Sequence, residues 1–213
     1  MKKLVAGIAE FHEKVRPRVR DTYARLALGQ SPDCLFFACS ASRVVPNVFA
    51  STDPGDLFVV RNVGNLVPPC GDAGHSTTDR SEAAAIEFAV LNLGVRDVVV
   101  CGHSECGAML ALTTASPPPE AVNLSAWLEV GRDAVGRLAR TPGLAPGLAA
   151  HNRLSQANVL QQLDHLASYP AVAEAMAAGR LKLHGWWFDI ANAEVLAWDG
   201  ADGQFTVIGG TAG

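Results

Sequence analysis

The chain has 213 residues, of which 49% are hydrophobic and 18% are charged, and its formal net charge is −4. This size and composition predict one globular domain over residues 1–213, and the lack of a basic surplus argues against nucleic acid as a partner. The five cysteines are odd in number and irregular in spacing, which argues against a disulfide framework and favours reduced thiols in the cytoplasm.

The first predicted element is a helical arm. Apolar residues recur at helical spacing from Leu4 to Leu26, and Pro17 divides the pattern into two pieces. The apolar patch at 4–9 is too short to span a membrane, so we expect no membrane segment here. The arm, over about residues 2–27, is expected to pack on a partner chain.

Strands and helices alternate along the rest of the chain. Short apolar runs predict buried strands at 34–38, 57–61, 97–101 and 180–188. Helical patterns lie at 80–93, 120–139 and 151–166, and the Asp-Gly turns within 194–208 predict a C-terminal hairpin or edge strand. The predicted fold class is therefore α/β, with a mainly parallel central sheet of about four strands flanked by helices.

Potential metal ligands follow two of the predicted strands. Cys39 comes directly after the strand at 34–38, and His103 and Cys106 follow the strand at 97–101. In parallel sheets, ligand sites gather beyond the carboxyl ends of the strands, so these side chains should converge. Two thiolates and an imidazole suit zinc, and three protein ligands leave a fourth tetrahedral position for water, as in catalytic sites.

These residues also have other interpretations. A cysteine at a strand end is usually a small buried hydrophobe, and that interpretation suffices for Cys34 and Cys101. Cys39 could also be the nucleophile of a thiol hydrolase, with His103 as its base. A phosphatase loop from Cys39 to Arg43 is excluded, because a phosphate cradle needs a longer run of backbone amides.

Three segments together resemble a known family. They are "CSASRVVPNVFASTDPGDLFVVRNVGNLVPP" from residue 39, "VVVCGHSECGAM" from residue 98 and "LHGWWFDI" from residue 183. The chain resembles a β-class carbonic anhydrase from about residue 30 to 190, and "GQSPDCLFFAC" is most similar to the plant-like branch. The resemblance implies that Cys39, His103 and Cys106 bind zinc. It also implies a dimer whose active sites lie near the subunit interface.

The same resemblance implies a substrate pocket. The pocket pattern of the plant-like branch falls on Gln30, Phe58, Val63 and Phe88. Gln30 would donate its amide to a substrate oxygen, and Phe88 stands where that branch often has tyrosine. The alternative is that Phe58, Val63 and Phe88 are only core residues.

Ala41 departs from the family pattern. At residues 39–43 that pattern is Cys-Ser-Asp-Ser-Arg, and here Ala41 replaces the aspartate. In the family the aspartate orients the hydroxide formed at zinc, and the arginine holds the aspartate. Because alanine does neither, we expect zinc binding to survive while turnover falls by roughly 10- to 1,000-fold. Arg43 is left as an uncompensated positive charge, which should attract anions.

The leading functional hypothesis is a carbonic anhydrase, a lyase that reversibly hydrates carbon dioxide to bicarbonate on zinc, with impaired catalysis. One alternative is a catalytically dead zinc protein that binds bicarbonate or other small anions. Another is a hydrolase of a related small molecule such as carbonyl sulfide. For each of these we expect a homodimer or a larger even homo-oligomer.

Overall fold

A single six-stranded sheet organises the molecule. The computed structural model describes residues 1–114, 116–141 and 143–209, so that residues 115, 142 and 210–213 of the predicted domain lie outside it. The strand order is β2-β1-β3-β4-β5-β6. The strands are β1 (Cys34–Cys39), β2 (Leu57–Asn62), β3 (Asp97–His103), β4 (Lys182–Asp189), β5 (Glu194–Asp199) and β6 (Gln204–Val207).

The predicted fold class is confirmed. Strands β1 to β4 are parallel, whereas β5 and β6 are antiparallel and extend the same sheet as a C-terminal hairpin. The helices that follow β1 and β2 are α3 (Pro46–Phe49) and α4 (Ser81–Glu87), the latter continued by a π-helical turn (Phe88–Leu93). Gly94 ends that turn in the left-handed conformation at φ 67°, which a glycine adopts without steric cost.

The long connection from β3 to β4 is helical. It contains α5 (Gly107–Thr113), α6 (Val122–Leu128), a 3₁₀ turn (Glu129–Gly131), α7 (Arg132–Arg140), α8 (Ala150–Ala167) and α9 (Pro170–Ala177). The single helix expected over 120–139 is therefore two helices joined at Gly131. A Cβ atom on Gly131 would lie 2.7 Å from a methyl carbon of Leu112, so the break lies where this segment packs closely on α5.

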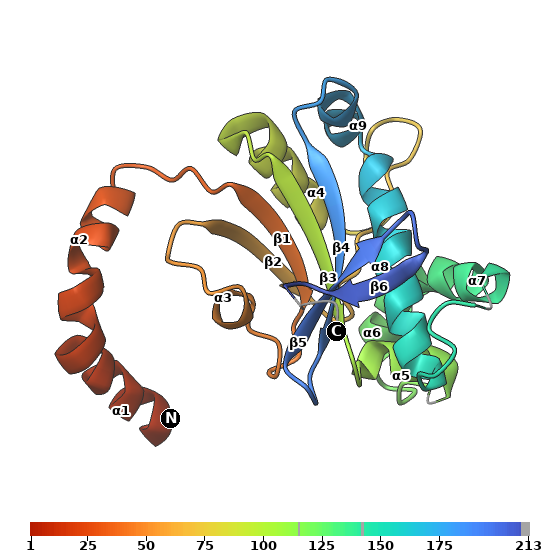
Figure 1. Cartoon of the computed structure of the whole chain (residues 1–213), viewed down its shortest axis with the longest axis horizontal. Helices are drawn as coiled ribbons and strands as arrows, with labels where there is room; N and C mark the ends of the chain where they lie inside the picture. Colours follow the sequence, from red (N-terminus) through yellow and green to blue (C-terminus); the bar gives the residue numbers. More distant parts are fainter. Residues whose placement is uncertain (115, 142, 210–213) are drawn as a thin grey trace.

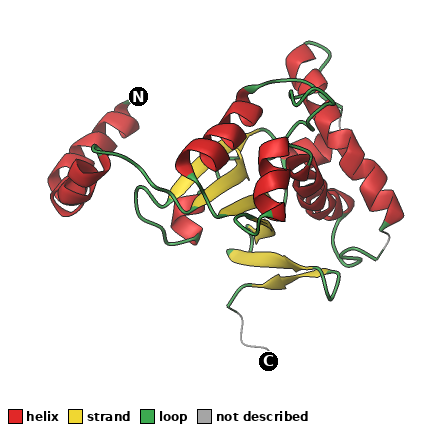
Figure 2. Ribbon diagram, turned by 90° about the horizontal axis from the view of Figure 1, so that it is seen from above, coloured by secondary structure: helices red, strands yellow, loops and turns green. Residues whose placement is uncertain are grey.

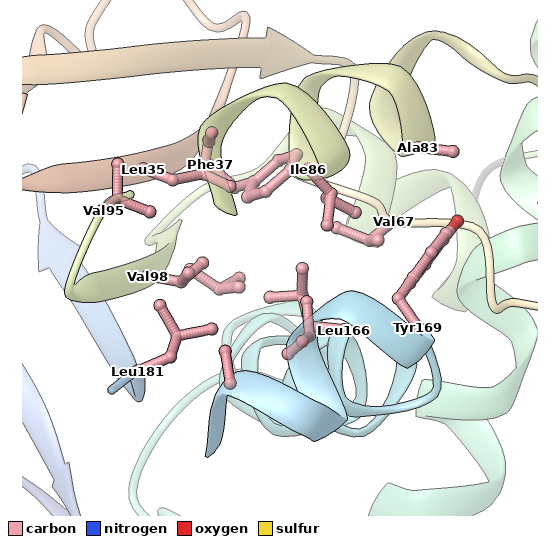
Figure 3. Packing of buried hydrophobic residues seen from close by; sticks show 14 of the residues in the cluster. Leu35, Phe37, Val67, Ala83, Ile86, Val95, Val98, Leu166, Tyr169 and Leu181 are labelled. Atoms are coloured by element: carbon pink, nitrogen blue, oxygen red, sulfur yellow. The ribbon is translucent and has the colours of Figure 1, made fainter. Parts of the chain in front are cut away.

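The main core lies between the sheet and helices α4 and α8. Along β1, Leu35 and Phe37 face this core, while Phe36 and Ala38 face the opposite side of the sheet, as the alternation of strand side chains requires. In Figure 3 the side chains of β1, β3 and α4 meet those of α8, among them Phe37, Val98 and Leu166. Figures 1 and 2 show helices of the main body packed around the sheet, with the N-terminal helices apart from it. In the described part of the chain, no helix is long and apolar enough to cross a membrane.

The N-terminal arm is helical and projects from this body (Figure 1). It consists of α1 (Lys2–Glu10), a π-helical turn (Phe11–Val15) and α2 (Arg16–Leu26). The amide of Arg16 donates to the carbonyl of Phe11, five residues earlier, immediately before Pro17. The ring of a helical proline crowds the carbonyl four residues before it, so the widened turn accommodates Pro17 without breaking the arm.

Candidate metal centre

Three potential metal ligands meet at the carboxyl end of the sheet. Cys39 is the last residue of β1, His103 is the last residue of β3, and Cys106 is the N-cap of α5. Because β1 and β3 are parallel neighbours, their ends lie side by side. The two sulfur atoms and a ring nitrogen of His103 all lie within 4.8 Å of one another, and all three residues are buried. Residues 1–114, 116–141 and 143–209 contain no second group of this kind.

The imidazole of His103 has the tautomer that a metal ligand needs. Its Nδ1 lies 2.8 Å from the carbonyl oxygen of Ser104. Because a carbonyl only accepts hydrogen bonds, Nδ1 must carry the proton, and Nε2 therefore has a free lone pair. This Nε2 is buried and has no hydrogen-bond partner among the described residues. An unpaired buried acceptor is costly, and a metal ion would satisfy it.

The Cys39 sulfur is surrounded by donors. The amides of Gly64 and Ala41 lie 3.4 Å and 3.5 Å from it. Its side-chain interaction with Cys106, together with the two amides, holds the pKa of Cys39 well below its usual range. The same interaction, with burial, raises the pKa of Cys106. Cys39 is therefore stabilised as a thiolate.

The donor set fits zinc. Sulfur and imidazole nitrogen are the ligands that zinc takes from proteins, and two thiolates with a neutral histidine balance its charge. Gly64 brings its amide to the sulfur at a φ of +86°, and a Cβ atom there would lie 2.9 Å from the Cβ of Ala108. Only glycine therefore fits at this position beside Cys39.

A cavity of about 430 Å³ opens beside Cys39. Ala41, Arg43 and Val63, all singled out in the sequence, line it together with Cys39. The rest of its wall is mostly small or apolar: Ser40, Ser42, Gly107, Ala108, Ala111, Leu124 and Leu128. The cavity therefore suits a small molecule of low polarity, with one cationic group at its wall.

Arg43 donates from Nη2 to the backbone carbonyl of Glu105, at 2.9 Å. The carboxylate of Glu105 is held instead by Asn152 Nδ2 at 2.9 Å and His151 Nε2 at 3.0 Å. These hydrogen bonds, Asn152 first, lower the pKa of Glu105. Within the described residues Arg43 forms no ion pair, so its charge is not paired with a carboxylate.

Sequence reasoning missed a second arginine at the site. Arg61 of β2 donates from Nε to the carbonyl of Cys39 at 3.0 Å and from Nη2 to the carbonyl of Ala41 at 2.8 Å. It thereby holds the turn that follows β1. Every residue carries a backbone carbonyl, so the residue types around Cys39 and Ala41 do not indicate that an arginine binds there. The only hint in the sequence is the position of Arg61 at the end of an apolar strand.

Three residues of the predicted pocket lie outside this cavity in the single chain. Gln30 is exposed beside a separate hollow at the root of the arm, with Tyr23 and Gly55. Phe58 and Phe88 pack against each other with ring centroids 5.7 Å apart. The pocket roles of these three residues remain predictions.

The fold and the site together define a class of protein: a mainly parallel α/β sheet with a candidate metal site of two cysteines and a histidine at the carboxyl ends of adjacent strands. Comparison with known proteins identifies the family. The family model described as Carbonic anhydrase matches residues 34–195. The chain is 38% identical over 205 residues to the carbonic anhydrase of Pseudomonas aeruginosa, covering 96% of this chain and 90% of that protein.

Solved structures agree. The structure of the β-carbonic anhydrase CcaA matches with a TM-score of 0.88 and 34% identity, covering 99% of this chain and 92% of that one. A tetrameric β-carbonic anhydrase from the filamentous ascomycete Sordaria macrospora matches with a TM-score of 0.70 and 31% identity, covering 92% of both chains. The chain belongs to the β-carbonic anhydrase family, and the predicted enzyme class is confirmed.

Proposed function

We propose that this chain hydrates carbon dioxide reversibly on a zinc ion held by Cys39, His103 and Cys106, and that Ala41 reduces its activity. The observation that carries the proposal is the unpartnered, buried Nε2 of His103 beside two cysteine sulfurs. When bound, zinc would supply a Lewis acid that lowers the pKa of a water to about 7.

The residues around the cavity divide the remaining work. Val63, Ala108 and Leu128 provide an apolar wall for carbon dioxide, which carries no charge. Arg43 provides the positive charge that favours bicarbonate, the anionic partner of the reaction. Ala41 faces the same cavity but has no polar side-chain atom, so it cannot accept a hydrogen bond where the family pattern has an aspartate.

The test measures zinc content and carbon dioxide hydration for this chain and for Ala41→Asp. We expect one zinc per chain in both proteins and at least about 10-fold faster hydration in the aspartate variant, since it regains a group that orients the nucleophile. Equal rates would contradict the role given to Ala41. Stoichiometric zinc with bicarbonate binding but no turnover in either protein would instead indicate an anion-binding protein, and turnover of carbonyl sulfide alone would indicate a hydrolase.

We also propose an even homo-oligomer in the cytoplasm. The arm exposes Leu4, Val5, Ile8 and part of Phe11, which a second copy could cover. All five cysteines are free, as expected in a reducing compartment. The arm and the sheet then belong to one domain over residues 1–213. A monomeric mass at micromolar concentration would contradict the assembly.

A further inference from the structure

The buried face of α8 carries a stripe of polar side chains. Asn152, Ser155, Asn158 and Gln162 recur every three or four residues, and all four are buried. A helix that packs against a sheet normally buries apolar side chains there, and buried amides are costly unless they are hydrogen-bonded. Asn152, Ser155 and Asn158 bond to the two turns around the candidate metal centre, and Gln162 bonds to Asn158.

The first branch of this stripe holds the turn that contains His103 and Cys106. Ser155, only 1% exposed, donates to the backbone carbonyl of His103 at 2.8 Å and accepts from Trp187 Nε1 at 3.1 Å. The side-chain oxygen of Asn152 accepts the amide of Glu105 at 2.8 Å. Glu105 has a φ of +57°, which is strained for a residue other than glycine, so this bond stabilises the turn between the two ligands.

The second branch ends at the sulfur of Cys39. Gln162 accepts the amide of Val67 at 2.8 Å and donates to Asn158 Oδ1 at 2.9 Å, which fixes the orientation of the Asn158 amide. Asn158 Nδ2 then donates to the carbonyl of Gly64 at 3.1 Å. The amide of Gly64 points at the Cys39 sulfur, 3.4 Å away. A run of hydrogen bonds thus leads from α8 to a ligand atom.

Helix α8 packs closely on β3 where the Ser155 branch begins. A Cβ atom on Gly102 would lie 2.7 Å from Val159 Cγ2 and 3.2 Å from the hydroxyl of Ser155. Gly102, directly before His103, therefore allows α8 to pack directly on β3. This close contact brings the Ser155 hydroxyl to the His103 carbonyl.

We infer that α8 presets the metal centre, with Ser155 and Asn158 as positioning residues that hold the two ligand turns in the conformation that binds the ion. The inference rests on the proposed zinc site. Neither side chain bonds directly to a ligand atom: Ser155 bonds the carbonyl of His103, and Asn158 bonds the carbonyl of Gly64, whose amide points at the Cys39 sulfur. Removing either donor would leave a buried carbonyl unpaired and allow the turn to relax, which costs affinity for the metal.

The experiment measures zinc dissociation constants and release rates by competition with a chromophoric chelator. Ser155→Ala and Asn158→Leu are compared with the unmodified protein and with Ser168→Ala. Ser168, just after α8, also bonds backbone groups through its hydroxyl, namely the amide of Cys70 and the carbonyl of His165, and neither residue is a candidate ligand. We expect zinc binding to weaken about 10-fold or more in Ser155→Ala and Asn158→Leu, and to stay within about twofold in Ser168→Ala.

A second readout separates positioning from general destabilisation. Each protein is loaded with Co²⁺, whose absorption reports the ligand geometry. We expect the spectrum to change in Ser155→Ala and Asn158→Leu and to stay unchanged in Ser168→Ala. The two variants act on different ligands, so either one alone decides the question if the other does not fold.

Wild-type zinc affinity and an unchanged cobalt spectrum in a folded Ser155→Ala or Asn158→Leu protein would overturn the inference alone. Failure of the unmodified chain to bind zinc would overturn both the inference and the proposed metal site. Zinc binding without carbon dioxide hydration, combined with weakened binding in the two variants, would overturn the proposed reaction and support the inference.

Discussion

The candidate metal centre at the carboxyl end of the sheet and the N-terminal arm differ in the contacts that stabilise them. The turns around Cys39 and His103 are fixed by side chains far away in sequence, such as Asn158 on Gly64 and Ser155 on His103. The arm has no buried residue, and its exposed Lys14 and Glu10 pair only four residues apart. The candidate site therefore has its donor atoms and their supports within one chain, whereas the apolar side chains of the arm are left exposed.

The largest effect is expected from removing a candidate ligand of the metal centre. Cys39→Ser replaces a thiolate, which Cys106 and two backbone amides stabilise, with a hydroxyl that zinc binds poorly. Losing a residue that only supports a ligand typically lowers metal affinity by about 10- to 100-fold, and we expect a larger loss of zinc affinity here. Metal analysis after dialysis checks this, with Cys101→Ser as the control because Cys101 is also a buried cysteine of the sheet but is not one of the three grouped side chains. Full zinc retention in Cys39→Ser would remove this cysteine from the site.

Disturbing the packing beneath the site should come next in size. Gly102→Ala places a methyl group 2.7 Å from Val159 Cγ2. We expect the free energy of unfolding to fall by about 1–3 kcal/mol, the usual cost of overpacking, measured by urea denaturation. Gly7→Ala on the arm is the control, because a methyl group there meets no atom within 4 Å. Gly74→Ala is less suitable, because Gly74 has a φ of +77°. Equal stability of Gly102→Ala and Gly7→Ala would contradict the tight contact.

The arm is tested through association. Phe11→Ala removes an aromatic ring from its exposed face. We expect association between subunits to weaken roughly 10-fold, as for an interface residue worth more than 1 kcal/mol, while zinc content stays at one per chain. Sedimentation at several concentrations measures the association, and Lys14→Ala is the control. Unchanged association in both Phe11→Ala and a chain lacking residues 1–27 would show that the arm is not the contact.

The smallest effect concerns anions at the cavity wall. A carboxylate at position 41 would offset the charge of Arg43, which lines the same cavity. Two unit charges about 4 Å apart in water interact by about 1 kcal/mol. We therefore expect chloride or bicarbonate to inhibit this chain at roughly fivefold lower concentration than Ala41→Asp. Inhibition curves of hydration measure this, and identical curves would show that Arg43 does not act on the bound anion.

Local patterns predicted much of the fold and the candidate ligands. The apolar runs fall on the parallel strands β1 to β4, and the two ligand motifs fall at the ends of β1 and β3. The helix expected at 151–166 is present as α8, but its buried polar face was not expected. Periodicity records which residues are apolar, whereas the partners of Ser155 and Asn158 are backbone groups 52 and 94 residues away.

The sequence by itself determined the order of the strands along the chain, most of the helices and the Cys, His, Cys donor set, because these depend on residue type and short spacing. Only the tertiary structure decided which atoms meet: Arg61 on the carbonyls of Cys39 and Ala41, the break at Gly131 against Leu112, and the free Nε2 of His103. Such contacts depend on how distant segments pack. They involve backbone carbonyls, backbone amides or the space around a glycine, so the types of the contacting residues do not reveal them.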